Sequence, residues 1–173
     1  MLYLAPLQGF SDYNYRLAYS RIFQGVSTFF IPYISVKNNE ILNRHKKEIL
    51  PDNNPQKRVI PQILVKDAAE TIFLSKLLAD YGYKEINLNL GCPYPMVTNR
   101  GRGTGLLPFP EKIKSILSAF YTNSELVLSV KIRARLHAFN EIEKIIPVFN
   151  EFPVSELIIH PRVAKQLYKG ILY

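Results

Sequence analysis

The stretch of sequence that decides the fold is Glu85-Ile86-Asn87-Leu88-Asn89-Leu90-Gly91-Cys92-Pro93. Apolar and polar residues alternate along it with the period of two that a β-strand gives its side chains. Ile86, Leu88 and Leu90 therefore share one face, whereas Asn87 and Asn89 share the other. The glycine and proline that follow indicate that the strand ends in a loop. The pattern predicts a strand with one apolar face and one polar face.

Five more β-rich runs occur along the chain, and segments of helical periodicity separate them. The predicted strands are Leu2–Pro6, Thr28–Pro32, Arg58–Val65, Glu85–Leu90, Leu126–Arg133 and Glu156–His160. Repeated β-α units of about thirty residues predict a parallel sheet and an α/β fold. We expect a TIM (β/α) barrel that is truncated to about six of the usual eight units.

Local signals place the helices between these strands. Asp12 and Asp67 are predicted helix N-caps, Pro110 suits the first turn of a helix, and Gly82 is a predicted stop signal. A further helix is predicted over residues 141–149. We expect the basic run Arg44-His45-Lys46-Lys47 to be a solvated helix face. The apolar face expected for the helix after Asp67 consists of Ala69, Ile72, Phe73, the aliphatic stem of Lys76 and Leu77.

A closed barrel needs more chain than this sequence contains. An eight-unit barrel usually takes about 250 residues, and six units account for nearly all of the 173 residues. The sequence stops soon after the sixth predicted strand. We therefore expect residues 1–173 to be the N-terminal part of a barrel domain from which the last units are absent.

The composition is that of one globular domain. With 47% hydrophobic and 21% charged residues, the chain differs from a disordered tail, a fibre or a multidomain protein. No apolar stretch approaches the ~18 residues of a membrane helix, and no basic region precedes the N-terminal apolar run. A single cysteine excludes an internal disulfide and a thiolate metal site. We expect no metal, no membrane association and a cytoplasmic location.

The charge balance favours a polyanionic partner. The chain has 22 Lys and Arg residues against 14 Asp and Glu residues, which gives a net charge of +8. Such an excess is typical of proteins that bind nucleic acid, but from charge alone a merely solvated basic surface is the commoner explanation. The positions of the basic residues have to decide between the two.

Four predicted strands each carry a polar side chain near the C-terminal end, namely Gln62, Asn89, Lys131 and His160. Active sites of (β/α) barrels are built at this end, so we expect the four side chains to converge. A lysine in an otherwise apolar strand is costly unless it is paired, which indicates an anionic or electron-rich ligand. Gln62 or His160 alone could be a structural residue. The convergence of all four favours a functional site.

Cys92 follows the central strand at the same end. A lone cysteine is often only a small buried apolar residue. On a loop at the active end, however, a thiol with an ordinary pKa of about 8.5 is protonated at neutral pH and can donate a proton. We therefore predict that Cys92 is a catalytic residue.

The order of these motifs resembles the flavin-dependent tRNA-dihydrouridine synthases. The resemblance rests on Ala5–Asp12, Arg16, Gln62, Asn89–Pro93, Gly101–Leu107, Val130–Arg133 and His160–Arg162, together with Gln166, Tyr168 and Gly170. It covers nearly all of the chain. Leu7 departs from the family, which commonly has methionine there, although both side chains are apolar and similar in size.

The resemblance implies an FMN enzyme that reduces uridine in tRNA to 5,6-dihydrouridine, with NADPH as the reductant. Cys92 would donate the proton that C5 of the uracil gains. The residues implied to bind FMN are Pro6, Leu7, Gln8, Gln62, Lys131 and His160. The residues implied to contact the substrate are Asn89, Arg133 and Arg162.

The resemblance also says where RNA should approach and what the sequence lacks. Basic residues follow the predicted strand ends on the active side, namely Arg100, Arg102, Arg133, Arg135, Arg162 and Lys165. The family's last two barrel units, which hold the FMN phosphate, and its helical tRNA-binding domain have no counterpart here. We expect residues 1–173 alone to bind FMN poorly and to be largely inactive.

Two alternative functions stay open at this point. Another FMN barrel oxidoreductase that acts on a free pyrimidine or an enone would have a similar site, and turnover of free uridine would favour it. A catalytically inactive RNA-binding fragment is the other alternative, which salt-sensitive tRNA binding without bound flavin would favour.

Overall fold

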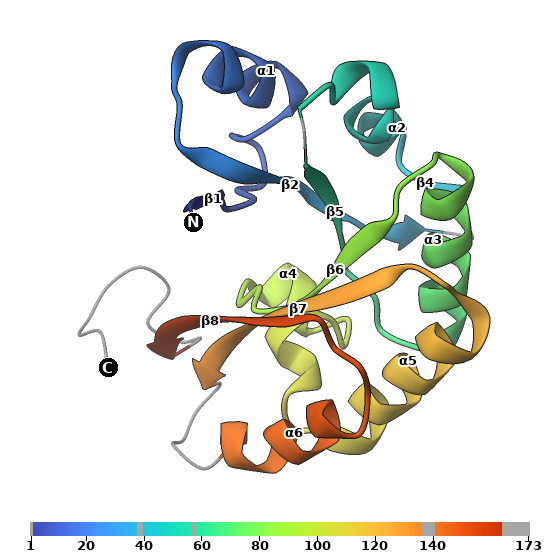
Figure 1. Cartoon of the computed structure of the whole chain (residues 1–173). Helices are drawn as coiled ribbons and strands as arrows, with labels where there is room; N and C mark the ends of the chain where they lie inside the picture. The colour runs from blue at the N-terminus through green and yellow to red at the C-terminus, as the bar shows by residue number, and fades with distance from the viewer. Residues whose placement is uncertain (1, 38–39, 57, 136–140, 164–173) are drawn as a thin grey trace.

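The computed structural model describes residues 2–37, 40–56, 58–135 and 141–163, and its main strands form one parallel sheet. These strands are β1 (Leu2–Leu4), β2 (Val26–Ile34), β5 (Val59–Ile63), β6 (Glu85–Leu90), β7 (Val127–Arg135) and β8 (Glu156–Val163). Their order in the sheet follows the chain, and each neighbouring pair is parallel. The sheet curls, and helices cover its outer side (Figure 1). The predicted six strands and the α/β barrel class are confirmed.

The helices begin and end at the signals that the sequence contains. They are α1 (Tyr13–Ile22), α2 (Asn43–Ile49), α3 (Ala68–Asp80), α5 (Pro110–Asn123) and α6 (Glu141–Asn150). The Asp12 carboxylate accepts a hydrogen bond from the Tyr15 backbone N–H at 2.8 Å, and Asp67 caps α3 in the same way. Gly82 follows α3 with a φ of 87°, a conformation that favours glycine. The predicted caps and the stop signal are confirmed.

Several element boundaries and short elements differ from the prediction. β1 ends at Leu4 because the chain enters a turn after Pro6, and β8 continues beyond His160 to Val163. The sequence pattern also missed elements of two to four residues, which carry too little periodicity to be detected. These are β3 (Val36–Lys37), β4 (Glu40–Ile41), α4 (Pro95–Thr98) and the 3₁₀ helices η1 (Pro51–Asn53) and η2 (Gly103–Leu106).

The prediction for the buried face of α3 was wrong except at Leu77, which packs against the main core. Ala69, Ile72 and Phe73 are exposed, and the residues that face the core are Thr71, Leu74, Ser75 and Leu78. The two hydroxyl groups tolerate burial because they bond to helix carbonyls, Thr71 to Asp67 and Ser75 to Thr71, both at 2.8 Å. A periodicity that counts only apolar residues therefore assigns the wrong face.

The basic run on α2 is only partly solvated, which corrects a second prediction. Arg44, Lys46 and Lys47 are exposed, but His45 between them is buried. Burial, and secondarily the charge of Arg44, lowers the pKa of His45 to about 4. His45 is therefore a neutral core residue at neutral pH.

The two faces of the sheet have different partners, as the alternation in β6 predicted. The outer-face residues Ile86, Leu88 and Leu90 pack in the main hydrophobic core with residues of α3 and α5. The inner face carries Asn87 and Asn89, which are buried inside the curl of the sheet. The sheet therefore separates an apolar core from a polar interior.

Polar side chains connect the strands at the N-terminal end of this interior. The Tyr3 hydroxyl, on edge strand β1, donates to Glu156 Oε1, on edge strand β8, at 3.0 Å. Arg58 forms an ion pair with Glu85 at 2.8 Å. These bonds hold the curvature at the N-terminal end and leave the opposite end of the strands for a site.

Candidate active site

A cavity of about 320 Å³ lies at the C-terminal ends of the strands. Nine of the ten predicted site residues line it, namely Pro6, Leu7, Gln8, Gln62, Asn89, Cys92, Lys131, Arg133 and His160. The tenth, Arg162, does not line it, but its Nη1 lies 3.4 Å from Nε2 of His160. The structure therefore brings together side chains from four strands and two loops, as the sequence predicted.

The cavity wall also contains residues that the sequence analysis did not single out. Phe10, Tyr33, Tyr94 and Met96 line it together with Gly91 and Pro93. Phe10 and Met96 are largely exposed to solvent. Phe10, Tyr94 and Met96 lie in turns, loops or a single helical turn that carry no periodic signal, whereas Tyr33 lies at the C-terminal end of β2 and could have been found by its place there.

Buried carboxamides form a chain of hydrogen bonds beneath the cavity. Asn89 Nδ2 donates to Gln62 Oε1 at 2.7 Å, Gln62 Nε2 donates to Asn87 Oδ1 at 2.7 Å, and Asn87 Nδ2 donates to Ser129 Oγ at 2.9 Å. Because every bond has a defined donor and acceptor, the chain fixes the orientation of each amide. Gln62 therefore presents a rigid polar edge to the cavity.

Asn89 holds the start of the loop that carries Cys92. Its Oδ1 accepts hydrogen bonds from the backbone N–H groups of Gly91 and Cys92, both at 2.9 Å. This arrangement is a local side-chain turn of the kind that asparagine favours. Two bonds occupy the carbonyl oxygen of Asn89, and one N–H of its amide nitrogen bonds to Gln62. The second N–H of that nitrogen is the group left for a ligand.

The glycine-rich part of the loop packs directly on Cys92. The Thr104 backbone N–H donates to the Cys92 carbonyl at 3.1 Å. Gly103 has a φ of 57°, and a Cβ atom there would lie 2.6 Å from the same carbonyl oxygen. Only glycine meets both conditions without a shift of the backbone.

Arg102 anchors this loop and does not face solvent, which corrects its predicted place on the RNA side. Its guanidinium is buried, forms an ion pair with Glu70 of α3, and donates to the Val36 carbonyl at 3.2 Å. Arg100 is exposed. Lys165, Gln166, Tyr168 and Gly170 lie outside the described residues, as does the side chain of Arg135.

The Cys92 thiol has an environment that keeps it protonated. Burial raises its pKa, against smaller opposing effects of a hydrogen bond from the Tyr94 backbone and of the Arg133 charge. At neutral pH the group is therefore an S–H donor. The same two opposing contacts stabilise the thiolate that proton donation would leave.

Three basic side chains, those of Lys131, Arg133 and His160, line the cavity from β7 and β8. Strand pairing places Lys131 beside Asn89 and Arg133 beside His160, and Arg133 Nε donates to the Gly91 carbonyl at 3.0 Å. Within the described residues, no carboxylate forms an ion pair with Lys131. Burial, and then the charge of Arg133, lowers the pKa of Lys131.

His160 adds a neutral ring to this part of the cavity. Burial, followed by the charges of Arg133, Lys131 and Arg162, lowers its pKa to about 4. This part of the cavity therefore combines a neutral imidazole with the positive charges of Lys131 and Arg133. Such a lining suits a ligand that is anionic or becomes negatively charged during a reaction.

Comparison with known families agrees with this geometry. A family model described as "Dihydrouridine synthase (Dus)" matches residues 3–173. The chain belongs to the dihydrouridine synthase family. Enzymes of the Dus family are flavin-dependent oxidoreductases.

Individual relatives carry names of the same kind. The chain is 29% identical to a probable tRNA-dihydrouridine synthase of Helicobacter pylori, over 97% of this chain and 51% of the relative. It is 23% identical to tRNA-dihydrouridine synthase B of Pasteurella multocida, over 98% of this chain and 51% of that protein. A probable tRNA-dihydrouridine synthase of Staphylococcus epidermidis is 36% identical over 53% of this chain and 28% of its own length. Nearly the whole chain aligns with the Helicobacter and Pasteurella relatives, and it spans about half of their length.

Neither a cluster of metal-ligating side chains nor a membrane-spanning helix occurs among the described residues. No group of three or more potential metal-ligating side chains comes together among them. In the part of the chain that the structure describes, no helix is both long and apolar enough to span a bilayer.

Proposed function

We propose that this Dus protein reduces uridine in tRNA to 5,6-dihydrouridine, with FMN as the cofactor, NADPH as the reductant and Cys92 as the proton donor. The observation that carries the proposal is the cavity that Cys92 and Lys131 both line: the thiol is protonated, and no carboxylate of the described residues forms an ion pair with the lysine. A reaction that adds a hydride and a proton to a substrate needs an acid that donates the proton. It also needs a cation that stabilises the negative charge that develops.

The residues on the cavity wall fit a flavin ring. Its pyrimidine edge offers both hydrogen-bond donors and acceptors, and the wall offers complementary groups. Gln8 Oε1 is buried without a hydrogen-bond partner, although it belongs to a cavity residue. Together with Gln62 and Lys131 it would bind this edge, while Pro6 and Leu7 would pack against the ring and His160 would contact the ring or the ribityl chain.

The proposed reaction adds one hydride and one proton across the C5–C6 double bond of uracil. Reduced FMN, when bound, supplies the hydride that adds to C6. Cys92 donates its proton to C5 and becomes a thiolate, which regains a proton from solvent. Lys131 would stabilise negative charge at the pyrimidine edge of the flavin ring. The amide nitrogen of Asn89 and the guanidinium of Arg133 would orient the uracil.

A base that is stacked in tRNA must turn out into this cavity before it can react. Exposed Arg100, beside the cavity loop, is suited to a phosphate contact, and Arg162 is the further predicted substrate contact. Because tRNA is the substrate, we place the activity in the cytoplasm. We further propose that residues 1–173 are the N-terminal part of the FMN-binding barrel, which matches their coverage of about half of each long relative.

The proposed activity is tested by incubating the protein with excess FMN, NADPH and tRNA that lacks dihydrouridine. The protein is kept in excess over tRNA, so that even slow single turnover gives measurable product. Nucleosides are then analysed by mass spectrometry, with free uridine as a parallel substrate. We expect dihydrouridine in the tRNA and none from uridine. Product from free uridine alone would favour the other FMN oxidoreductase, and tRNA binding without any product would favour an inactive RNA-binding chain.

A further inference from the structure

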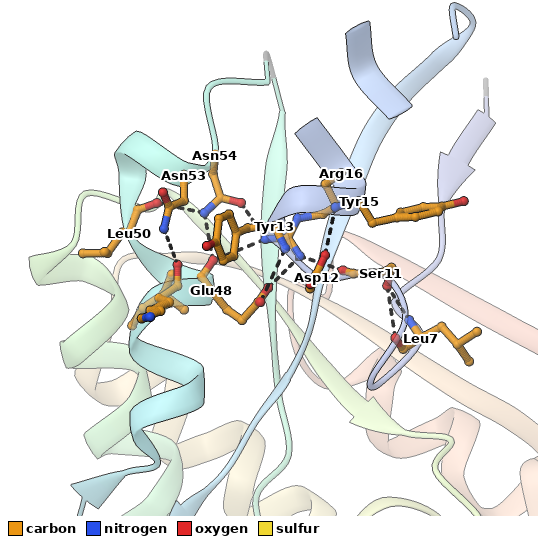
Figure 2. Close-up of polar contacts among 12 residues, drawn as sticks. Leu7, Ser11, Asp12, Tyr13, Tyr15, Arg16, Glu48, Leu50, Asn53 and Asn54 are labelled. Carbon is orange, nitrogen blue, oxygen red and sulfur yellow. Dashed lines mark hydrogen bonds and ion pairs between the residues drawn. The ribbon is translucent and has the colours of Figure 1, made fainter. Parts of the chain in front are cut away.

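A completely buried arginine lies behind one wall of the cavity. Arg16, in the second turn of α1, has an exposed fraction of 0%. Its Nη1 donates to the Ser11 carbonyl at 2.8 Å and to Glu48 Oε2 at 2.9 Å. Its Nη2 donates to Asn54 Oδ1 at 2.7 Å and to the Glu48 carbonyl at 3.3 Å. Figure 2 shows that the guanidinium joins three separate segments of the chain.

One of these segments is the turn of residues 7–11, which follows β1. The Ser11 hydroxyl accepts a bond from the Leu7 N–H at 2.8 Å and donates to the Leu7 carbonyl at 3.3 Å. The backbone N–H groups of Phe10 and Ser11 also donate to the Leu7 carbonyl, both at 3.0 Å. Gly9 has a φ of 83°, which makes this tight path possible. The turn is compact, and the hydrogen bond from Arg16 ends on its last residue.

This turn supplies a wall of the cavity. Leu7, Gln8 and Phe10 all line the cavity, and the Oε1 atom of Gln8 is buried with no hydrogen-bond partner among the described residues. The position of that oxygen depends on the turn, and the turn is tied to the rest of the molecule at Ser11. Arg16 itself does not line the cavity.

The other two segments are the end of α2 and the turn after it. Asn54 Nδ2 donates to the carbonyls of Glu48 and Leu50 at 2.8 and 2.9 Å. Glu48 Oε1 accepts a bond from the Tyr13 N–H at 3.4 Å. A planar guanidinium matches this set of acceptors, because its donors point in fixed directions, whereas a lysine ammonium could reach only some of them. Arg16 thus fixes the turn against a frame that is itself hydrogen-bonded.

We propose that Arg16 is a positioning residue that holds the 7–11 turn in place as a wall of the cavity, so that the side chain of Gln8 faces the ligand. The identification of this ligand as a flavin rests on the function proposed above. The role of Arg16 in holding the turn is independent of that function. Arg16 has no contact with the ligand and acts through the Ser11 carbonyl.

The experiment compares Arg16→Met with wild type by amide hydrogen exchange of the ligand-free protein. We expect exchange at Leu7, Phe10 and Ser11 to accelerate by about tenfold or more, because their hydrogen bonds depend on an anchored turn. The exchange rates of amides in β6 and β7 should change only by the factor that the change in the global free energy of unfolding accounts for. Arg16→Lys should restore part of the protection, and Glu48→Gln is a milder variant that keeps the experiment informative if Arg16→Met does not fold.

The matched control is Arg58→Met, which removes the Arg58–Glu85 ion pair at the opposite end of the strands. It should lower the melting temperature without selective exchange at residues 7–11. Selectively faster exchange at residues 7–11 in both variants, or in neither of them, would overturn the proposal. Arg16 would then be a residue that stabilises only the fold.

A flavin titration then tests the consequence for the cavity. Arg16→Met should weaken flavin binding by roughly tenfold at a temperature well below its melting point, and Arg58→Met should not. Faster exchange with unchanged flavin affinity would contradict the role of the turn in the site. If wild-type protein binds no flavin, the proposed function fails, whereas the exchange pattern still decides whether Arg16 holds the turn.

Discussion

At the scale of single residues, the Cys92 thiol decides whether the cavity is catalytic. Cys92→Ala should lower single-turnover formation of dihydrouridine by roughly 10²- to 10⁴-fold, the usual contribution of a general acid. Flavin affinity should stay the same. Cys92→Ser, which keeps the size and a weaker acid, is the matched control and should retain little more activity. Undiminished product in Cys92→Ala would remove the thiol from the mechanism.

The raised pKa of Cys92 also predicts how the reaction depends on pH. A general acid works only in its protonated form, so activity is lost as pH rises through the thiol pKa. Because burial raises that pKa, the decline should begin above the ordinary thiol range of about 8.5. A profile of single-turnover rate against pH checks this, and a decline already below pH 8 would contradict it.

Lys131 should weaken the fold while it serves the site. Its pKa is lower in the folded protein than in the unfolded chain, so folding disfavours the charged form and stability rises with pH across the interval between the two pKa values. Lys131→Met should therefore raise the melting temperature of the ligand-free protein, because it removes a buried cation that lies beside Arg133 and has no ion pair among the described residues. Flavin binding should weaken in the same variant. A variant that melts lower and binds flavin normally would contradict both roles.

His45 makes a prediction for acid stability. Its pKa is about 4 in the folded protein and about 6.5 when unfolded, so the unfolded state takes up a proton first. The stability that neutral His45 contributes is present above about pH 6.5 and is lost as pH falls toward 4. His45→Phe should reduce the loss of melting temperature between pH 7 and pH 4.5. His160 has a similar shift, so a residual pH dependence is expected.

At the scale of elements, the loop that carries Cys92 offers a matched pair of glycines. Gly101 and Gly103 both have positive φ, but a Cβ at Gly101 would meet nothing within 4 Å, whereas one at Gly103 would clash with the Cys92 carbonyl. Gly101→Ala should cost about 1 kcal/mol of unfolding free energy, the cost of backbone strain alone. Gly103→Ala should cost more and should also reduce product formation. Urea unfolding of both variants measures the difference, and equal costs would contradict the packing of the loop on Cys92.

The elements show which parts of the structure the sequence could predict. The alternation in β6, the caps Asp12 and Asp67 and the stop at Gly82 are local signals, and they predicted strands and helices correctly. The buried face of α3 was not predictable in this way, because Thr71 and Ser75 satisfy their hydroxyl groups within the helix. Arg102 was misplaced for a related reason: its partner Glu70 is distant in sequence, and only the fold brings the two together.

At the scale of the whole molecule, the sheet explains why so many site residues were predicted. Parallel strands in sequential order bring every C-terminal strand end to one rim, so a polar residue at each predicted end is a candidate for the same cavity. Tyr33, at the C-terminal end of β2, follows the same rule, but the sequence analysis did not single it out, whereas Tyr94 and Met96 reach the cavity from a loop and the short α4. The cross-sheet bond from Tyr3 to Glu156, which joins the first and last strands, is equally invisible in the sequence.

The most direct test of the central claim is whether the cavity binds the flavin ring. Riboflavin carries the ring without the phosphate, so it probes this cavity apart from any phosphate contact. We expect added riboflavin and FMN to show a shifted visible absorption band and quenched fluorescence with wild-type protein, and both changes to be greatly weakened by Lys131→Met. The absence of any spectral change with either flavin, or an identical change with Lys131→Met, would contradict the assignment of the cavity as a flavin site.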